Sequence, residues 1–274
     1  MRKIGVNVMH DFGNTTEEAL RAIKSAGFDA FFTDFGRKYI AECAKLAEKL
    51  DLTYDTIHAQ FGAVDGIDIN AMWKDGEDGD RYAAGLVETV NDAADFGVPT
   101  VIMHTTIGNV LPHLCRVGFD RVGKVIEQAE KRGVTLAFEN LEYPEPVGII
   151  LNKYKSKNVG YCYDIGHEYC YTPGIKYLKM YGDRLAALHL HDNDGLADSM
   201  DPCYRDDYHR IPFDGKVDYN RFANELRETG YQGTIMLEIG NRKDYDVYRD
   251  LTLAEFYEKG AKAAEKIRAL VDGE

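Results

Sequence analysis

Histidines and acidic residues close several short apolar segments of this sequence, where their side chains could do chemistry. The stretch VGYCYDIGHE at 159–168 is the clearest example, since a run typical of a buried strand ends at Asp164 and His167 follows three residues later. Taken alone, this stretch fits equally well an aspartate that caps a helix and a histidine that bonds to backbone. The recurrence of the pattern at other segment ends favours a functional site.

The same kinds of residue end or follow most of the other predicted strands. In chain order these residues are His10, His58, His104, Glu139, Asp164, His167, His189, His191, Asp207, His209 and Glu238. Seven of the eight histidines belong to this set, and only His113 lies elsewhere. Structural histidines would be scattered, so the set predicts imidazoles and carboxylates that converge on one cleft. Such a cleft is typical of a site for a divalent transition metal.

The predicted metal site takes one ligand from each of four strands: Glu139, Asp164, His189 and Glu238. Mixed oxygen and nitrogen ligands suit Mn, Zn, Co or Mg, and the spacing does not choose among them. Glu139 and Glu238 would approach from separate strands, as base and acid on a hydroxy-ketone, with a metal-stabilised enediolate between the two proton transfers. An ion pair is the ordinary explanation for one such glutamate, but it does not account for the whole set.

Strands and helices alternate along the chain. The predicted strands are 3–9, 30–35, 52–59, 100–106, 135–140, 159–164, 185–192 and 234–240. The predicted helices are 15–26, 38–50, 81–96, 120–132, 145–154, 175–181, 219–229 and 253–270. Eight such units predict an α/β fold, a closed (β/α)8 TIM barrel that forms a single domain over 1–274, with its site at the C-terminal ends of the strands. An open doubly wound sheet is the alternative, but VNVMHDFGNTT is not a Gly-rich phosphate-binding turn.

Composition narrows the class of protein further. The chain is 45% hydrophobic and 29% charged, so it can bury a sizeable core, and its formal net charge of −13 argues against a surface that binds nucleic acid. No signal peptide or membrane span is predicted, and the five cysteines form no CxxC pair. We expect a cytoplasmic protein with no membrane or nucleic-acid partner. The sequence leaves open whether it forms a homo-oligomer.

The sequence resembles the xylose-isomerase-like barrel superfamily over nearly its whole length. The resemblance rests on FEN at 138–140, YDIGH at 163–167, HLHD at 189–192 and LEIG at 237–240. It implies a metal held by the four predicted ligands, with the two glutamates as the acid–base pair. The resemblance favours His189 over His191 as the ligand, because the metal-binding histidine of the family precedes an acid by three residues, as His189 precedes Asp192. The resemblance further implies that the substrate contacts His58, His104, His167, His191 and His209.

The same resemblance implies an enzyme of carbohydrate metabolism. The expected activity is that of an isomerase acting on a sugar or sugar phosphate, either a ketose epimerase or an aldose–ketose isomerase. An inosose-type dehydratase is an alternative that needs the same metal and an added general acid. Arg205, Arg210 and Arg242 near the predicted rim could pair with an anionic substrate, although exposed loop cations explain them as well.

The endonuclease IV branch of the superfamily is the rival. That branch is a zinc phosphodiesterase acting on abasic DNA, and its larger ligand set is matched by His58, His104, His167, Asp207 and His209. The negative charge and the acidic loops 60–80 and 193–214 argue against a DNA-binding surface. Phe61 and Trp73 in the first of these loops suit a sugar, although Trp73 is also suited to packing the loop.

Overall fold

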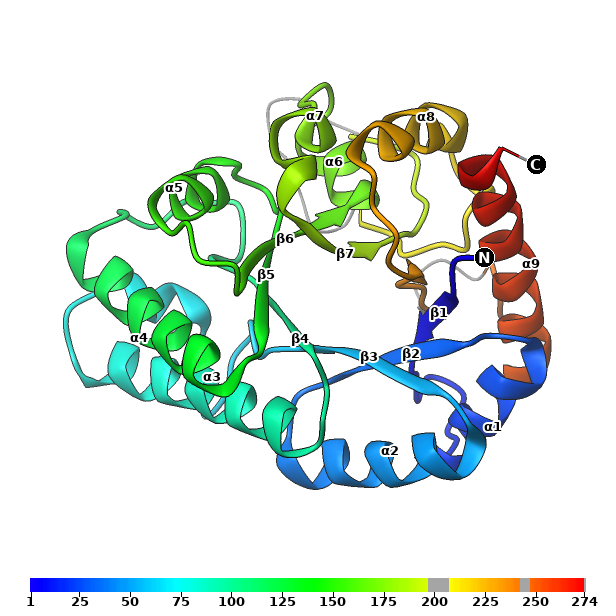
Figure 1. Ribbon diagram of the computed structural model, residues 1–274, viewed down its shortest axis with the longest axis horizontal. Helices are drawn as coiled ribbons and strands as arrows, with labels where there is room; N and C mark the ends of the chain where they lie inside the picture. Colours follow the sequence, from blue (N-terminus) through cyan, green and yellow to red (C-terminus); the bar gives the residue numbers. More distant parts are fainter. Residues whose placement is uncertain (197–206, 242–246, 274) are drawn as a thin grey trace.

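The computed structural model describes residues 1–196, 207–241 and 247–273. Eight parallel strands form one sheet in the order β7-β6-β5-β4-β3-β2-β1-β8, ringed by helices (Figure 1). The strands are β1 (Ile4–Asn7), β2 (Ala30–Asp34), β3 (Thr53–His58), β4 (Thr100–Met103), β5 (Thr135–Glu139), β6 (Val159–Asp164), β7 (Leu185–His189) and β8 (Ile235–Leu237). A parallel bridge between Leu190 and Leu237 joins the two ends of the sheet. The fold is therefore the predicted single-domain TIM barrel.

The helices follow the strands in the predicted alternation. They are α1 (Thr16–Ala26), α2 (Arg37–Leu50), α3 (Glu77–Asp95), α4 (Arg116–Arg132), α5 (Glu145–Lys153), α6 (Ile165–Tyr171), α7 (Tyr177–Tyr181), α8 (Tyr219–Thr229) and α9 (Leu253–Asp272). Two of them begin about a turn earlier than predicted, α3 at Glu77 and α4 at Arg116. Helix α6 was not predicted, because it starts directly at the end of a strand with no intervening loop.

Two apolar layers hold the barrel together. The larger core packs helices against the outside of the sheet, with side chains such as Leu20, Phe138 and Phe256 fully buried. Inside the barrel the apolar side chains are smaller and fewer, in two clusters made of Ile102, Ala137, Cys162 and Ala187, and of Ala30, Phe32 and Met236. The apolar filling leaves room above it for polar side chains at the strand ends.

The long loop between β3 and α3 is tied down by a buried cation. Arg121 of α4 donates to the carbonyl oxygens of Met72, Lys74 and Gly76 at 2.6–2.8 Å. Trp73 is buried, and its Nε1–H donates to the Thr105 carbonyl at 2.8 Å. Trp73 thus packs the loop and does not face a ligand.

Cys43, Cys115 and Cys162 are free thiols, and Cys203 lies outside the described residues. Among the helices described, none has the length and apolar character needed to cross a membrane.

Candidate functional site

The first group of donors surrounds His189 at the end of β7. Its Nδ1 lies 2.6 Å from Glu139 Oε1 and 3.0 Å from Glu238 Oε2. Asp164, from the end of β6 and the register partner of His189, completes the group. Single donor atoms of the four residues lie within 4.8 Å of one another, so together they could hold one metal ion.

Asp164 uses its two carboxylate oxygens differently. Oδ1 accepts a hydrogen bond from the His167 backbone N–H at 2.6 Å and so caps α6. Oδ2 is buried and has no hydrogen-bond partner among the described residues. Both explanations of the 159–168 stretch are therefore compatible, since one oxygen caps the helix and the other is left for a ligand.

The second group shares Glu139. Glu139 Oε2 lies 2.9 Å from His104 Nε2 and 3.4 Å from His58 Nε2, while Oε1 belongs to the first group. His58, His104 and Glu139 could together hold an ion. A carboxylate with one oxygen in each group is placed to bridge two cations.

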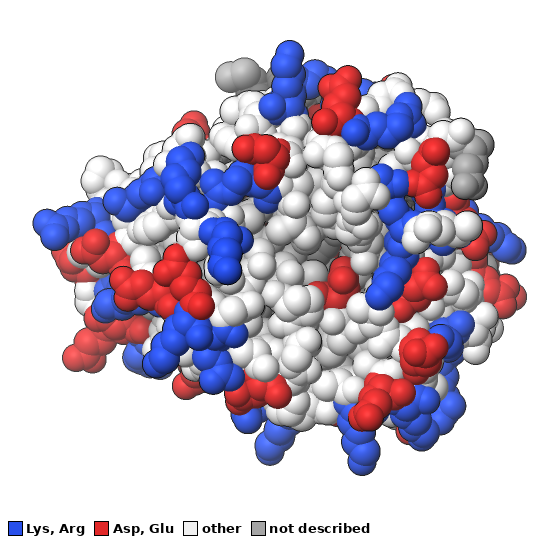
Figure 2. All heavy atoms as spheres, in the orientation of Figure 1, with Lys and Arg blue, Asp and Glu red and all other residues white. Residues whose placement is uncertain are grey.

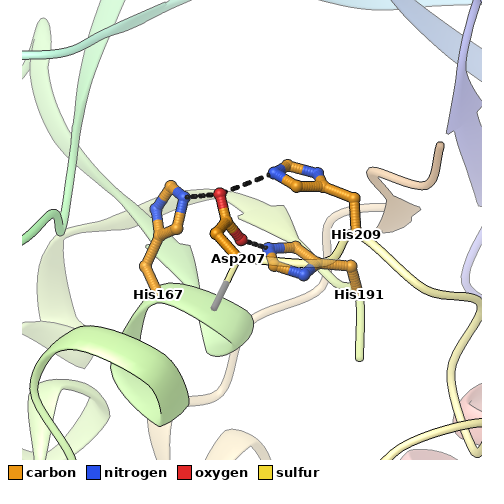
Figure 3. Close-up of side chains that lie close together, drawn as sticks. All are labelled: His167, His191, Asp207 and His209. Atoms are coloured by element: carbon orange, nitrogen blue, oxygen red, sulfur yellow. Dashed lines mark hydrogen bonds and ion pairs between the residues drawn. The ribbon is translucent and has the colours of Figure 1, made fainter. Parts of the chain in front are cut away.

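The third group surrounds Asp207 (Figure 3). Its Oδ2 lies 2.9 Å from His209 Nε2 and 3.4 Å from His167 Nε2, and its Oδ1 lies 3.5 Å from His191 Nε2. The His191 and His209 rings are stacked with centroids 4.0 Å apart. His191 Nε2 also lies 3.2 Å from Asp164 Oδ1, so this group adjoins the first.

Backbone carbonyls fix the orientation of three of these imidazoles. The Nδ1 atoms of His58, His167 and His209 face the carbonyls of Ala59, Asn140 and Glu238 at 2.8, 3.0 and 3.1 Å. A carbonyl only accepts, so each Nδ1 carries the proton and each Nε2 offers a lone pair when the ring is neutral. This second-sphere arrangement is typical of metal-binding histidines.

Buried charges are balanced within the groups. Burial alone would raise the pKa of Glu139, but the imidazoles of His189, His104 and His58 outweigh burial and lower that pKa well below its ordinary value. In the same way, His209 and His167 lower the pKa of Asp207. Burial lowers the pKa of His104 to about 4, whereas Asp207 outweighs burial and raises the pKa of His209 to about 9. Without metal, protons on some imidazoles compensate the carboxylates.

The residues present fit a divalent metal. Buried donor atoms without a hydrogen-bond partner in the described chain are Asp164 Oδ2, His104 Nδ1, His189 Nε2 and both ring nitrogens of His191. Unpaired buried polar atoms are costly, and their concentration in one place indicates a missing ligand. Mixed imidazole and carboxylate donors are those expected for a borderline transition metal.

A cavity of about 150 Å³ opens beside the three groups. Of the residues predicted from sequence, His58, His104, His167, Asp207, His209 and Glu238 line it. His191 is completely buried and is not among the residues that line the cavity. His10 is exposed and bonds to Tyr39 and to the backbone of Asn14, so it lies apart from the three donor groups.

Several lining residues were not predicted. These are Thr106, Glu142 and Tyr171, from loops and from α6, whereas Phe61, which also lines the cavity, was already associated with a sugar in the sequence. Glu142 Oε1 accepts from the Gly108 N–H at 3.0 Å, and burial raises the pKa of its carboxyl group. Residues in loops follow no hydrophobic periodicity, so the sequence does not indicate which of them line a cavity. Phe61 is the exception, because an aromatic side chain in a long loop suggests a binding role.

Asp34 is a further residue that sequence analysis missed. It ends β2 and is the register partner of His58. Burial among the neighbouring groups raises its pKa, although part of the side chain is exposed to solvent. The sequence contained a signal for it, since AFFTD ends in an acid as β5 does at Glu139 and β6 does at Asp164.

Asp192 organises the loop that carries His209. Its carboxylate accepts hydrogen bonds from the backbone N–H groups of Asn193, Phe213 and Val217 at 2.8–3.0 Å. His209 itself has a left-handed backbone with φ of 49°. These three hydrogen bonds to one buried carboxylate fix the backbone at Asn193, Phe213 and Val217, on either side of the strained His209.

The fold and these donor groups can be compared with known proteins. The model of the family "Xylose isomerase-like TIM barrel" matches residues 20–271. The chain belongs to this family. Family membership confirms the resemblance seen in the sequence and leaves the reaction to be determined.

Two relatives found by sequence are uncharacterized proteins, so their names indicate no activity. The uncharacterized protein y4fM of Sinorhizobium fredii is 30% identical over 170 residues, which cover 56% of this chain and 51% of the relative. This match therefore spans about half of that relative's length. The uncharacterized protein MJ1311 of Methanocaldococcus jannaschii is 24% identical over 292 aligned positions, covering 96% of this chain and 92% of the relative.

Solved structures share the fold. D-psicose 3-epimerase from Clostridium cellulolyticum H10 superposes with a TM-score of 0.78 at 14% identity, covering 98% of this chain and 99% of that chain. An L-ribulose 3-epimerase superposes with a TM-score of 0.73 at 15% identity, covering 99% of this chain and 97% of that chain. The 3-keto-D-glucoside 4-epimerase YcjR from E. coli superposes with a TM-score of 0.71 at 16% identity, covering 98% of this chain and 100% of that chain. At these identities the likeness concerns the fold.

Proposed function

We propose that the protein is a divalent-metal-dependent sugar isomerase or epimerase. The observation that carries the proposal is the convergence of Glu139, Asp164 and Glu238 on His189, from four separate strand ends beside a cavity. These four side chains would hold the ion. When bound, a divalent ion supplies Lewis-acid stabilisation of the negative charge that develops on substrate oxygens.

Glu238 and Glu139 are the acid–base pair of the proposed reaction. Glu238 lines the cavity, so it removes the proton from the carbon next to the substrate carbonyl. Glu139 is fully buried and its Oε1 faces the same Nδ1 of His189 as Glu238 does, so it is assigned the return of the proton. An epimerase requires two such groups, because the proton leaves one face of the carbon and returns to the other.

Solvent isotope exchange tests the proposal. The Mn²⁺-loaded protein should catalyse exchange of deuterium from D₂O into the carbon next to the carbonyl of at least one ketose in a broad panel, detected by NMR. A chelator and Glu238→Gln should each abolish exchange, while Glu228→Gln, exposed on α8, should leave it unchanged. Absence of exchange over the whole panel in protein shown to contain metal would refute the proposal. The same spectra would reveal a dehydrated product if the enzyme eliminates water.

A second candidate function is hydrolysis of phosphodiesters by a zinc cluster. The observation in its favour is that Glu139 is shared by two donor groups and that the Asp207 group adjoins them. Against it, the formal net charge is −13, and the face drawn in Figure 2 carries basic and acidic side chains interspersed around its rim and no continuous basic surface. Arg205 and Arg242 lie outside the described residues, and Arg210 pairs with Asp194 at 3.0 Å.

Metal content and substrate assays separate the two candidates. A single tightly bound ion together with isotope exchange supports the sugar enzyme. More than one zinc per chain together with cleavage of abasic DNA would replace it with the phosphodiesterase.

A further inference from the structure

The end of β2 carries an acid that belongs to none of the donor groups. Asp34 is the register partner of His58 on the neighbouring strand β3, and neighbouring strands lie about 5 Å apart. Its carboxylate has no hydrogen bond or ion pair with any residue in the described parts of the chain, and the residue is exposed. It is also absent from every set of described residues that could hold a metal.

Alternation along β2 shows where Asp34 points. Phe32 faces the inside of the barrel, where its ring stacks on His189 with centroids 4.8 Å apart. Side chains two residues apart on a strand share a face. Asp34 therefore points to the inside of the barrel mouth, one layer above Phe32 and on the side of the ring opposite the Asp207 group.

Neighbouring polar groups make this side of the mouth suitable for hydroxyl groups. His10 Nε2 lies 3.2 Å from Tyr39 Oη, close to the end of β2. Arg37, three residues after Asp34, is bound to Asp92 and Asp95 of α3 and so is turned away. Lys38 is the other nearby cation, and it is exposed at the start of α2.

We propose that Asp34 is a specificity-determining residue that selects an uncharged polyhydroxy substrate over its phosphorylated form. A carboxylate only accepts hydrogen bonds, and its two oxygens can receive two adjacent hydroxyl groups. The same fixed negative charge repels a phosphate, in a mouth that already holds Glu238 and Asp207. This inference rests on the proposed sugar reaction and names the class of its substrate.

Direct binding tests the inference without turnover. We would measure, by calorimetry on the Mn²⁺-loaded protein, the affinities of D-glucitol, xylitol and galactitol and of their terminal phosphates. Wild-type protein should bind the neutral polyol at least tenfold more tightly than its phosphate. Asp34→Asn should weaken polyol binding about tenfold and reduce the preference to threefold or less. Lys38→Ala is the matched control of opposite charge. Its preference for the polyol over the phosphate should stay within twofold of the wild-type value.

Three outcomes would overturn the inference: equal or tighter binding of the phosphates by the wild type, an unchanged preference in Asp34→Asn, or no binding of any neutral polyol. The isotope-exchange experiment keeps this failure apart from failure of the proposed function. If isotope exchange occurs but Asp34→Asn still prefers the neutral polyol, the role of Asp34 is refuted and the proposed reaction stands. A preference that depends on Asp34, without exchange on any ketose, refutes the reaction alone.

Discussion

Asp164 accepts a hydrogen bond from the His167 backbone N–H at 2.6 Å, so a member of the first donor group starts the helix that carries a member of the third. Through this bond the position of the Asp207 group depends on the end of β6. Helix α6 has only seven residues, too few to be stable without its cap and its packing.

Substitutions at Asp164 should separate its two roles. Asp164→Asn keeps an oxygen that can cap α6 but removes the negative charge, so metal affinity should fall while metal-free stability changes little. Asp164→Ala should lose metal affinity as well and be destabilised by about 1 kcal/mol relative to Asn. Metal analysis by mass spectrometry and urea unfolding of the chelated protein measure the two effects. Equal stability of the two variants would show that the cap contributes nothing.

Glu139 and Glu238 should differ in how many ions they affect. Glu139 has an oxygen in each of two groups, whereas Glu238 meets His58 and His189 on the cavity side. If the wild type binds more than one ion, Glu139→Gln should weaken two of them by at least about 100-fold, while Glu238→Gln leaves the Asp207 group unaffected. Titration with Zn²⁺ followed by calorimetry resolves the sites. Loss of a single site in Glu139→Gln would contradict the bridging position.

Gly166 leaves space that His191 needs. A Cβ at this position would overlap the imidazole ring of His191, which is fully buried. We expect Gly166→Ala to destabilise the protein by about 1–3 kcal/mol and to lower metal affinity, because the ring has no free space to move into. Gly62→Ala is the control, since its Cβ would meet no atom within 4 Å. Thermal unfolding measures the stability of both variants. If Gly166→Ala were as stable as the wild type, the packing of His191 against Gly166 would be contradicted.

Asp192 should act as a positioning residue for the loop of His209. An amide in its place has one acceptor oxygen and directs an NH₂ group toward backbone donors, which should cost about 1–3 kcal/mol. Asp192→Asn should therefore be less stable and bind metal less tightly, although Asp192 itself is in no donor group. Asp183→Asn, at an exposed position, should match the wild type in both measurements.

The metal-free protein should lose stability at alkaline pH. The folded pKa of His209 is about 9, above its unfolded value of about 6.5, because Asp207 favours the charged ring. The ion pair therefore contributes fully below pH 6.5, and its contribution, on the order of 2 kcal/mol, is lost as the pH rises through 9. In chelator, the gap in Tm between wild type and His209→Asn should shrink over that range. A gap that is constant with pH would contradict this assignment.

Much of the barrel was predictable because strand and helix periods are local. Apolar segments in the sequence predicted all eight strands, and α1 begins within one residue of its predicted start, behind a capping box formed by Thr15 and Glu18. The starts of α3 and α4 were placed too late, since Glu77 and Arg116 lie in polar stretches without apolar periodicity. Helix α6 escaped prediction because Asp164 serves both as the last residue of the strand and as the helix cap.

By itself, the sequence determined which residue types end which strands, and parallel strands then require that these residues share one end of a barrel. Only the tertiary structure decided how they divide into groups. The split of Glu139 between two groups, the burial of His191 and the unpaired Asp34 all depend on strand register and on loop paths between distant parts of the chain. Those contacts join residues tens of positions apart, so no local pattern in the chain encodes them.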